Sequence, residues 1–247
     1  MSKDVADIFI EGLRQLGFAV DDGLASPFYA QFSQYRQELL DWNTRTNLTA
    51  ITNPDDVLIK HFLDSLSLLK AGLPSRASHP IRLLDIGSGA GFPGLPLKIV
   101  CPTWQVTLLE ATGKKTAFLQ HMVEVLGLEK IEVVHGRAEE LAHHKHYRAT
   151  FDIVTARAVS SLSTLLEYCA PYCRIGGSIL LPKKGDLTSE LEQGKRAARL
   201  VGATLQDDIP INLPGLDDGR RILVWQQQKV CPTTYPRSGA AMAKKPL

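Results

Sequence analysis

Apolar residues recur at helical spacing in the first 78 residues of the chain. Steps of three and four residues, the period of one face of an α-helix, define two stripes. The stripes are Val5, Ile8, Phe9, Leu13 and Leu16, and then Phe28, Phe32, Tyr35, Leu39 and Trp42. Helix-start signals, Ser26-Pro27 and Asn53-Pro54, precede the second stripe and a third helical segment that ends near Leu69. The pattern predicts three amphipathic helices that form a cap over residues 1–78 and not an independent fold.

From Ile81 onward, short apolar runs alternate with helical stretches. The apolar runs are residues 81–86, 105–110, 131–136, 151–156, 177–182, 203–211 and 220–228. The helical stretches begin near Pro93, Gly113, Ser161 and Asp186. This alternation is typical of a parallel, doubly wound sheet that is covered on both faces. No helix separates the last two runs, so we predict a seven-stranded, Rossmann-like α/β sheet over residues 79–229 that ends in an antiparallel hairpin.

Composition narrows the class of protein. The chain has 247 residues, 44% of them hydrophobic and 22% charged, which excludes a disordered, collagen-like or coiled-coil protein. No apolar run reaches the ~20 residues of a membrane span and no secretory signal is visible, so we expect no membrane partner. The four cysteines form no CxxC pair, which favours a reducing cytoplasm.

Charge is distributed unevenly along the chain. Residues 1–78 carry seven Lys/Arg and ten Asp/Glu, whereas the remainder carries 21 and 16. This asymmetry permits a polyanionic partner on the C-terminal part without establishing one. Residues 230–247 are rich in Pro, Ser, Gly and Ala and contain no acidic residue. We therefore expect a basic, flexible tail there.

The strongest local signal is the segment LLDIGSGAGFPG, residues 83–94. An apolar strand reaches Asp85, and Gly87, Gly89 and Gly91 then crowd a tight turn before a helix. Glycine lets the backbone approach a ligand closely, and the amide groups at a helix start are free to bind it. In open α/β sheets, the turn after the first strand is where a nucleotide-like cofactor lies. A purely structural turn is the alternative, but it leaves three alternating glycines unexplained.

The spacing of the glycines bears on the kind of cofactor. Residues 89–94 satisfy the G-x-G-x-x-G dinucleotide pattern by letter, but Gly87 already occupies the place of its first glycine. Counted from Gly87, the third glycine would fall on Phe92. The pattern D-x-G-x-G-x-G from Asp85 instead resembles the first motif of class I S-adenosylmethionine (SAM) methyltransferases. That resemblance implies that Asp85 lies beside the methionine part of SAM.

An acidic residue, Glu110, ends the second strand 19 residues after Gly91. A carboxylate at this place can accept hydrogen bonds from both ribose hydroxyls, which supports SAM and dinucleotides equally. An exposed strand-end acid is the alternative. Further candidates for the cofactor site follow this and the next strands: Ala111, Thr112, Ala138, Glu139 and Arg157.

The ordered set of motifs resembles one family. LLDIGSGAGFPGLPL, LLEATGKKTAFL, GRAEEL and FDIVTARAVSSL follow one another as in the GidB/RsmG family, and TNLTAI, KHFLDSL and YPRSG extend the similarity over nearly the whole chain. The resemblance implies SAM-dependent methylation of guanine N7 in 16S ribosomal RNA. It also implies these SAM contacts: Gly87, Phe92, Glu110, Ala111, Thr112, Ala138, Glu139 and Arg157. Ala90 and Glu110 stand where the family often has Pro and Asp, and the tail SGAAMAK is less basic than many family tails.

The chemistry of such a transfer needs no catalytic dyad or triad. Guanine N7 has an in-plane lone pair and no proton, so the reaction needs alignment and no general base. We therefore predict no catalytic residue of that kind. His61 and Asp64 share a helix face, where helix packing and a role beside the substrate compete evenly.

Two clusters of metal-ligand types have plainer explanations. His143, His144 and His146 fit a solvated loop better than a metal site, because no carboxylate or thiol completes the set. Cys169 and Cys173 are four residues apart on an expected helix and fit a buried core. We expect no metal.

Basic residues near the carboxyl ends of the strands are candidate RNA contacts. They are Lys114, Lys115, Lys183, Lys184, Arg220 and Arg221. Each taken alone fits a solvated surface charge, but together they would form a track for phosphates. We expect looped or single-stranded RNA, because the target base must leave its stack.

The leading hypothesis is a cytoplasmic SAM-dependent methyltransferase that modifies N7 of a guanine in 16S ribosomal RNA, free or in the small ribosomal subunit. One rival is an NAD-dependent oxidoreductase, supported by the G-x-G-x-x-G letters. Another is a non-catalytic RNA-binding factor in ribosome assembly that retains the fold. A methyltransferase with a protein or small-molecule acceptor also stays open, because cofactor motifs do not encode the acceptor.

Overall fold

The computed structural model describes residues 5–18, 27–72, 80–157 and 160–247. The helix-start signal at Ser26 and the boundary between residues 78 and 79 lie outside this part of the chain. The N-terminal region is helical, as predicted. It contains α1 (Val5–Gln15), α2 (Pro27–Asn43) and one continuous run made of α3 (Pro54–Val57), the π-helical η1 (Leu58–Leu63), α4 (Asp64–Leu66) and the 3-10 turn η2 (Ser67–Ala71).

The third helical run begins and ends where its local sequence requires. The side-chain oxygen of Asn53 accepts hydrogen bonds from the amides of Asp55 and Asp56 at 2.8 and 3.1 Å, which caps the helix ahead of Pro54. Gly72 ends the run with a φ of +63°. Within this run, the buried residues of η1 and α4 face the sheet domain.

Seven strands form one mixed sheet. They are β1 (Arg82–Ile86), β2 (Gln105–Glu110), β3 (Ile131–His135), β4 (Phe151–Ala156), β5 (Cys173–Lys183), β6 (Ala203–Pro210) and β7 (Arg221–Gln227). The order is β3-β2-β1-β4-β5-β7-β6, and β7 runs in the direction opposite to the other six strands. This confirms the predicted fold class and the terminal antiparallel hairpin.

One strand boundary differs from the prediction by more than one residue. Strand β5 begins at Cys173 instead of residue 177. The two glycines there, Gly176 and Gly177, look like a turn in sequence. In the structure they lie within the strand, where the register against β4 shifts and a Cβ on Gly177 would come within 2.9 Å of the Asp152 carbonyl oxygen. The glycines allow a close, irregular pairing and do not end the strand.

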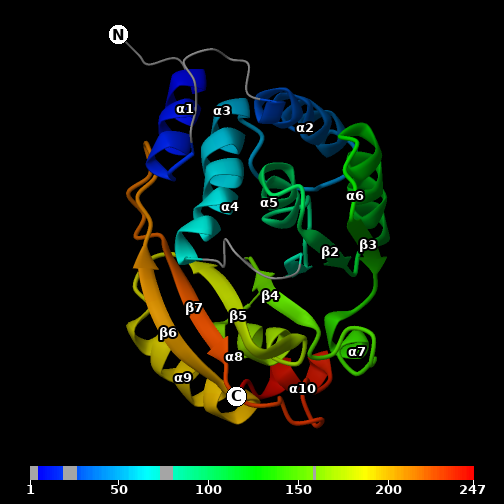
Figure 1. Ribbon diagram of the computed structural model, residues 1–247, viewed down its shortest axis with the longest axis vertical. Coiled ribbons are helices and arrows are strands. Elements are labelled where there is room, and N and C mark those ends of the chain that lie inside the picture. Colours follow the sequence, from blue (N-terminus) through cyan, green and yellow to red (C-terminus); the bar gives the residue numbers. More distant parts are fainter. Residues whose placement is uncertain (1–4, 19–26, 73–79, 158–159) are drawn as a thin grey trace.

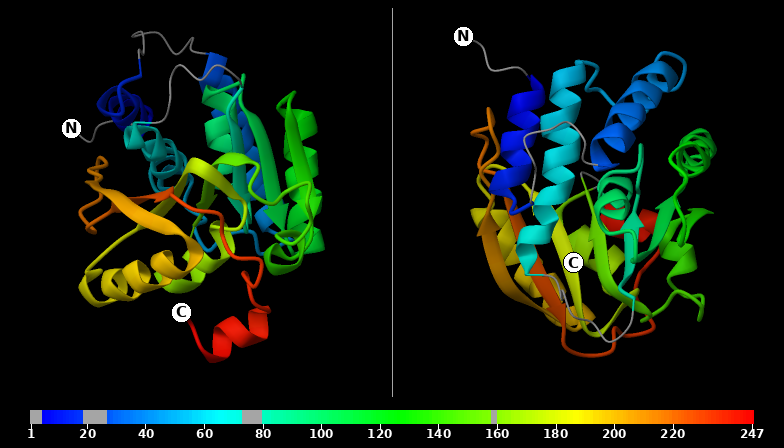
Figure 2. Two further views of the ribbon diagram at one scale, coloured as in Figure 1. Left: turned by 60° about the horizontal axis from the view of Figure 1, so that its bottom comes forward. Right: turned by 45° about the horizontal axis from the view of Figure 1, so that its top comes forward.

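Helices cover both faces of the sheet (Figures 1 and 2). The N-terminal helices, α5 (Gly94–Val100) and α6 (Gly113–Val125) pack on one face, and α8 (Leu162–Cys169) and α9 (Thr188–Val201) pack on the other. Alternate residues of a strand enter different cores: Leu83 packs with Phe62 and Phe118, whereas Leu84 packs in the core that holds Trp225. The N-terminal helices therefore share a hydrophobic core with the sheet.

The C-terminal segment differs from the expected flexible tail. It contains a short helix, α10 (Gly239–Lys244), which lies beside the one-turn helix α7 (Ala138–Leu141) (Figure 1). Met242 of this segment is 1% exposed and Cys231 is 5% exposed. The composition of the segment is typical of mobile chain, but its few apolar residues are buried and fix it to the domain.

Candidate functional site

The loop between β1 and α5 forms the predicted glycine turn. Gly87, Gly89 and Gly91 have φ angles of +68°, +60° and +96°, which side chains rarely adopt. The amide of Gly87 donates to the Leu109 carbonyl at 2.8 Å, which fixes the turn to β2. A Cβ on Gly91 would lie 2.4 Å from Leu95, whereas a Cβ on Gly89 would meet only the Gly87 carbonyl at 3.8 Å. Gly91 is thus required by packing, and Gly89 faces open space.

Asp85 is buried below the turn. Its Oδ2 accepts a hydrogen bond from the amide of Gly94 at 2.9 Å, and its Oδ1 has no hydrogen-bond partner among the described residues. Burial raises the pKa of this carboxyl to about 7. Such an oxygen is costly unless a polar or cationic group meets it. Asp85 therefore fits a site that a positively charged ligand completes.

Glu110 connects the end of β2 to the turn. Its two carboxylate oxygens accept hydrogen bonds from the amides of Gly89 and Thr112 at 2.9 and 2.8 Å. Each oxygen of a carboxylate has two lone-pair positions, so each can still accept a hydroxyl. Glu110 is 6% exposed, so it is not the exposed strand-end acid of the alternative interpretation. Its carboxylate is instead hydrogen-bonded within the loop.

Two connected cavities surround the turn. The first, which we call the glycine-turn cavity, has a volume of about 410 Å³. The second, the α7 cavity, has about 150 Å³ and lies at the ends of β2 and β3. Gly87 and Ala111 line both, so the two cavities are neighbours on either side of this backbone.

Most of the predicted cofactor residues line these cavities. The glycine-turn cavity contains Gly87, Gly89, Phe92, Glu110, Ala111 and Arg157, and the α7 cavity contains Ala138 and Glu139. Asp85, Gly91 and Thr112 line neither, although Asp85 accepts a hydrogen bond from the amide of Gly94 and the amide of Thr112 donates to Glu110. The donor set fits a nucleoside cofactor: carboxylate oxygens for ribose, a buried acid for a cation and glycine backbone for close approach.

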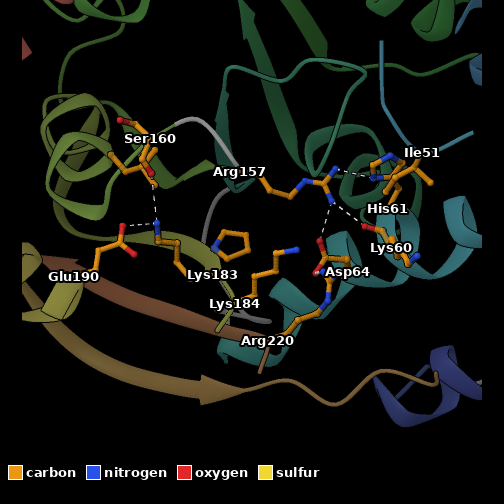
Figure 3. A pocket seen from close by; sticks show the side chains of 12 residues that line it. Ile51, Lys60, His61, Asp64, Arg157, Ser160, Lys183, Lys184, Glu190 and Arg220 are labelled. Atoms are coloured by element: carbon orange, nitrogen blue, oxygen red, sulfur yellow. Dashed lines mark hydrogen bonds and ion pairs between the residues drawn. The ribbon is translucent and has the colours of Figure 1, made fainter. Parts of the chain in front are cut away.

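A third cavity of about 420 Å³ lies next to the glycine turn; we call it the basic cavity (Figure 3). Its walls come from the third helical run, the ends of β4 and β5, the start of α9 and the residue before β7. Its cationic residues are Lys60, Arg157, Lys183, Lys184 and Arg220. His61 and Arg157 line both this cavity and the glycine-turn cavity. The two cavities therefore adjoin through these side chains.

An ion-pair network joins the helical region to the sheet in the basic cavity. Asp64 pairs with Arg157 at 2.8 Å and with Arg220 at 2.5 Å, and Figure 3 shows both guanidinium groups turned toward this carboxylate. The three side chains are 9%, 16% and 14% exposed. Asp64 therefore has a packing role, because it joins the helical region to the sheet, and its side chain also lines the basic cavity.

His61 is held neutral in this network. A guanidinium has no acceptor, so its nitrogen donates to Nδ1 of His61 at 3.0 Å, and Nε2 then carries the proton toward Thr49 at 2.8 Å. Burial, followed by the charge of Arg157, lowers the pKa of His61 to about 3. The ring stacks on Phe92 with 4.3 Å between centroids. His61 is therefore a packed, uncharged surface between the two cavities.

The structure separates the six basic RNA candidates. Lys183, Lys184 and Arg220 line the basic cavity, where Lys183 also pairs with Glu190 at 2.6 Å. Lys115 lines the glycine-turn cavity, and Lys114 lies beside it in the sequence, exposed and outside all three cavities. Arg221 pairs with Asp208 at 2.7 Å on the hairpin. Three of the six candidates therefore line one cavity, and their contact with RNA stays a prediction.

Sequence reasoning missed several wall residues. They are Leu48, Thr49, Ile51, Lys60, Ser160 and Glu190. The motif TNLTAI contains three of them and could have indicated a wall segment, because a polar, turn-rich stretch follows α2 directly. Ser160 and Glu190 carry no signal of their own, since their positions depend on how α8 and α9 pack.

Metal and membrane features are absent from the part of the chain that the structure describes. It contains no group of three or more His, Cys, Asp or Glu residues that could hold a metal ion. None of the helices in that same part has the length and hydrophobicity that crossing a bilayer requires. Cys169 ends α8 and Cys173 begins β5, so the expectation that they share a helix was wrong, but both are buried and unpaired, as the core interpretation predicted.

Comparisons with known proteins identify the family of this chain. The family model described as rRNA small subunit methyltransferase G matches residues 28–210. A ribosomal RNA small subunit methyltransferase G of Dehalococcoides mccartyi is 45% identical over 238 residues, which cover 96% of this chain and 98% of that protein. The protein of the same name from Roseiflexus sp. is 44% identical over 219 residues, covering 88% and 91%.

Solved structures support the fold. A predicted O-methyltransferase from Agrobacterium tumefaciens is similar with a TM-score of 0.51 and 20% identity, over 66% of this chain and 80% of that one. A ribosomal protein L11 methylase from Lactobacillus delbrueckii gives a TM-score of 0.50 and 12% identity, over 68% and 80%. Family match, full-length relatives and glycine-turn geometry lead to one assignment: the chain belongs to the GidB family, rRNA small subunit methyltransferase G.

Proposed function

We propose that this protein is a SAM-dependent methyltransferase that methylates N7 of a guanine in 16S ribosomal RNA. The observation that carries the proposal is the shared wall of His61 and Arg157 between the glycine-turn cavity and the basic cavity. A cofactor in the first would lie next to an anionic nucleotide in the second. Membership of the GidB family supports the ribosomal RNA of the small subunit as substrate.

The residues of the glycine turn and of α7 would hold SAM. When bound, SAM supplies a methyl group on a sulfonium sulfur, which leaves to a nucleophile while the sulfur keeps the bonding electrons. Asp85 provides a buried negative charge below the turn, and Glu110 provides acceptors for ribose hydroxyls. The small α7 cavity, with Ala138 and Glu139, suits a flat heterocycle at the end of β3.

The chain's own part in the transfer is alignment. Guanine N7 carries a lone pair and no proton, so no side chain has to remove one. His61, neutral with its Nε2 proton directed to Thr49, has no free base nitrogen and serves as a packed surface. Methylation makes the base cationic, and Asp64 offsets part of the charge of Arg157 and Arg220, which limits their repulsion of that base.

The basic cavity would receive the RNA. Lys183, Lys184 and Arg220 offer cationic groups for phosphates around the target nucleotide. The depth of such a site requires the base to leave its stack, which favours a loop or single strand. Substrate RNA and small subunits occur together in the cytoplasm, where we expect the enzyme to act.

The decisive experiment combines binding with product mapping. We expect the purified protein to bind SAM and not NAD, and to transfer one labelled methyl group to 16S RNA from cells that lack the gene. Mass mapping should locate the label on N7 of a single guanine. Preferential NAD binding would favour the oxidoreductase rival, and SAM binding without transfer to naked RNA or small subunits would favour the assembly factor.

A further inference from the structure

The C-terminal segment is bound to the domain through a buried ion pair. Glu167 on α8 is 0% exposed, and both of its carboxylate oxygens accept hydrogen bonds from Arg237. The Nε and Nη2 atoms of Arg237 donate at 2.8 and 2.6 Å, and its backbone amide donates at 2.9 Å. A charged pair of this geometry fixes both the position and the direction of the segment.

A second arginine binds the backbone of the same segment. Arg148, which follows α7, donates hydrogen bonds to the carbonyl oxygens of Cys231, Pro232 and Tyr235 at distances between 2.9 and 3.0 Å. It also donates to the carbonyl of Ala142, the residue at the end of α7, at 3.0 Å. One guanidinium group therefore connects the tail to the C-terminus of α7.

The tail reaches the wall of the α7 cavity at Gly239. A Cβ on this glycine would lie 2.8 Å from Oε1 of Glu139 and 3.2 Å from Nη2 of Arg137. These two side chains pair with each other at 2.7 Å, and both line the α7 cavity. The start of α10 therefore lies against the ion pair, and a methyl group on Gly239 would displace the ends of both side chains.

The α7 helix depends on such outside contacts. It has four residues and none of them is buried. A single helical turn is unstable in water without tertiary packing. On the domain side, the hydroxyl of Tyr172 donates to the Ala138 carbonyl at 2.6 Å. On the other side, the tail supplies the contacts.

We propose that the C-terminal tail positions Glu139 and so sets the affinity of the α7 cavity for the adenine end of SAM. Gly239 acts as a positioning residue through Glu139, and Arg237 holds the tail in register. This inference rests on the proposed function, because it takes the α7 cavity as part of the SAM site. It gives the tail a role on the cofactor side of the enzyme, away from the basic cavity.

The test is a double-mutant cycle read out as the dissociation constant for SAM. Gly239→Ala should weaken SAM binding about tenfold, because it displaces the Glu139 carboxylate by a fraction of an ångström. Glu139→Ala should also weaken binding. The two together should be no weaker than Glu139→Ala alone, since the methyl group then has no carboxylate to displace. Independent, multiplying effects would overturn the proposal.

Steady-state kinetics separate positioning from general damage. Gly239→Ala should raise KM for SAM and leave kcat and KM for RNA within about twofold of the wild type. The matched control is Ala240→Val, which adds bulk at the next, exposed position of the same helix. Equal losses in both variants, or a fall in kcat at saturating SAM, would contradict a positioning role.

Arg237→Lys tests the proposal in a second, independent way. Lysine keeps the charge but cannot donate two parallel hydrogen bonds to Glu167, so SAM affinity should fall while the exposed control Lys244→Ala stays at the wild-type value. If the wild-type protein itself binds no SAM, the proposed function fails. If it binds SAM and all tail variants bind equally well, only the inference about the tail fails.

Discussion

The glycine-turn cavity and the basic cavity adjoin, yet they are built in opposite ways. The first is centred on the two chain segments that follow β1 and β2, which amide hydrogen bonds to Glu110 and Leu109 hold together. The second consists of long charged side chains from five separate parts of the chain. Most substitutions leave backbone amide and carbonyl groups in place, except where a glycine is replaced. In a network of charged side chains, each residue can be replaced separately. The first suits a cofactor that many enzymes use, and the second suits recognition of one acceptor.

The comparison predicts the largest loss of stability in the basic cavity. Asp64→Ala leaves Arg157 and Arg220 facing each other without their shared carboxylate, which should lower the free energy of unfolding by about 3–5 kcal/mol. Urea unfolding measures the loss. The matched control is Asp56→Ala on the same helical run, whose partly exposed pair with Lys60 should contribute less than about 1 kcal/mol. Similar losses of unfolding free energy in both variants would show that the Asp64 network contributes no more than an exposed ion pair.

The second prediction compares two glycines of the turn between β1 and α5. Gly91→Ala forces a Cβ against Leu95 at a φ of +96°, and should cost about 2–4 kcal/mol of unfolding free energy. Gly89→Ala adds a Cβ in open space and should cost only about 1 kcal/mol for its positive φ.

Gly89→Ala should affect SAM binding much more than it affects stability. Its new methyl group would project into the cavity, so SAM affinity should fall more than about tenfold while the fold persists. Calorimetric titration with SAM, beside unfolding curves of both variants, measures the contrast. If Gly89→Ala binds SAM as tightly as the wild type, the cofactor does not approach this turn.

Local patterns explain why one of the two cavities was predicted from sequence. The strand that ends at Asp85 and the glycines that follow it are neighbours in the chain, so apolar periodicity and glycine spacing predict their arrangement. Strand β1 was placed within one residue. Glu110 was predicted because it ends the adjacent strand, where side chains converge.

The basic cavity could not be predicted in the same way. Asp64 and Arg220 are far apart in sequence, and their pairing depends on how the helical run packs over β7. The tail was mispredicted for the same reason: Glu167 is buried on α8, and nothing near Arg237 in the sequence identifies it as the partner. Ion pairs between distant segments leave no periodic signal.

A third prediction concerns the charge buried under the glycine turn. The pKa of Asp85 is raised in the folded protein to about 7, so the folded state holds a proton that the unfolded state releases above about pH 4. The contribution of this group to stability therefore falls as the pH rises from about 4 to about 7. His61, whose folded pKa is lowered to about 3, contributes the opposite slope below about pH 6.5.

Asp85→Asn should remove the first of these slopes. At pH 8 the variant should unfold with a free energy about 1–3 kcal/mol higher than the wild type, and the two should converge near pH 4. The same variant should bind SAM more weakly, since a neutral amide cannot offset a sulfonium charge. Unfolding free energies at several pH values test the first statement, and a constant difference across this pH range would contradict it.

The smallest effect on stability should come from a change at Lys184, which lines the basic cavity. Lys184→Ala should change the unfolding free energy by less than about 0.5 kcal/mol and leave SAM binding intact. RNA binding should still weaken, and the slope of log affinity against log salt should decrease by about one, because one phosphate contact is lost. Lys145→Ala, an exposed lysine that lines none of the three cavities, provides the control. An unchanged salt slope for Lys184→Ala would mean that RNA approaches from another face, and the basic cavity would then serve structure alone.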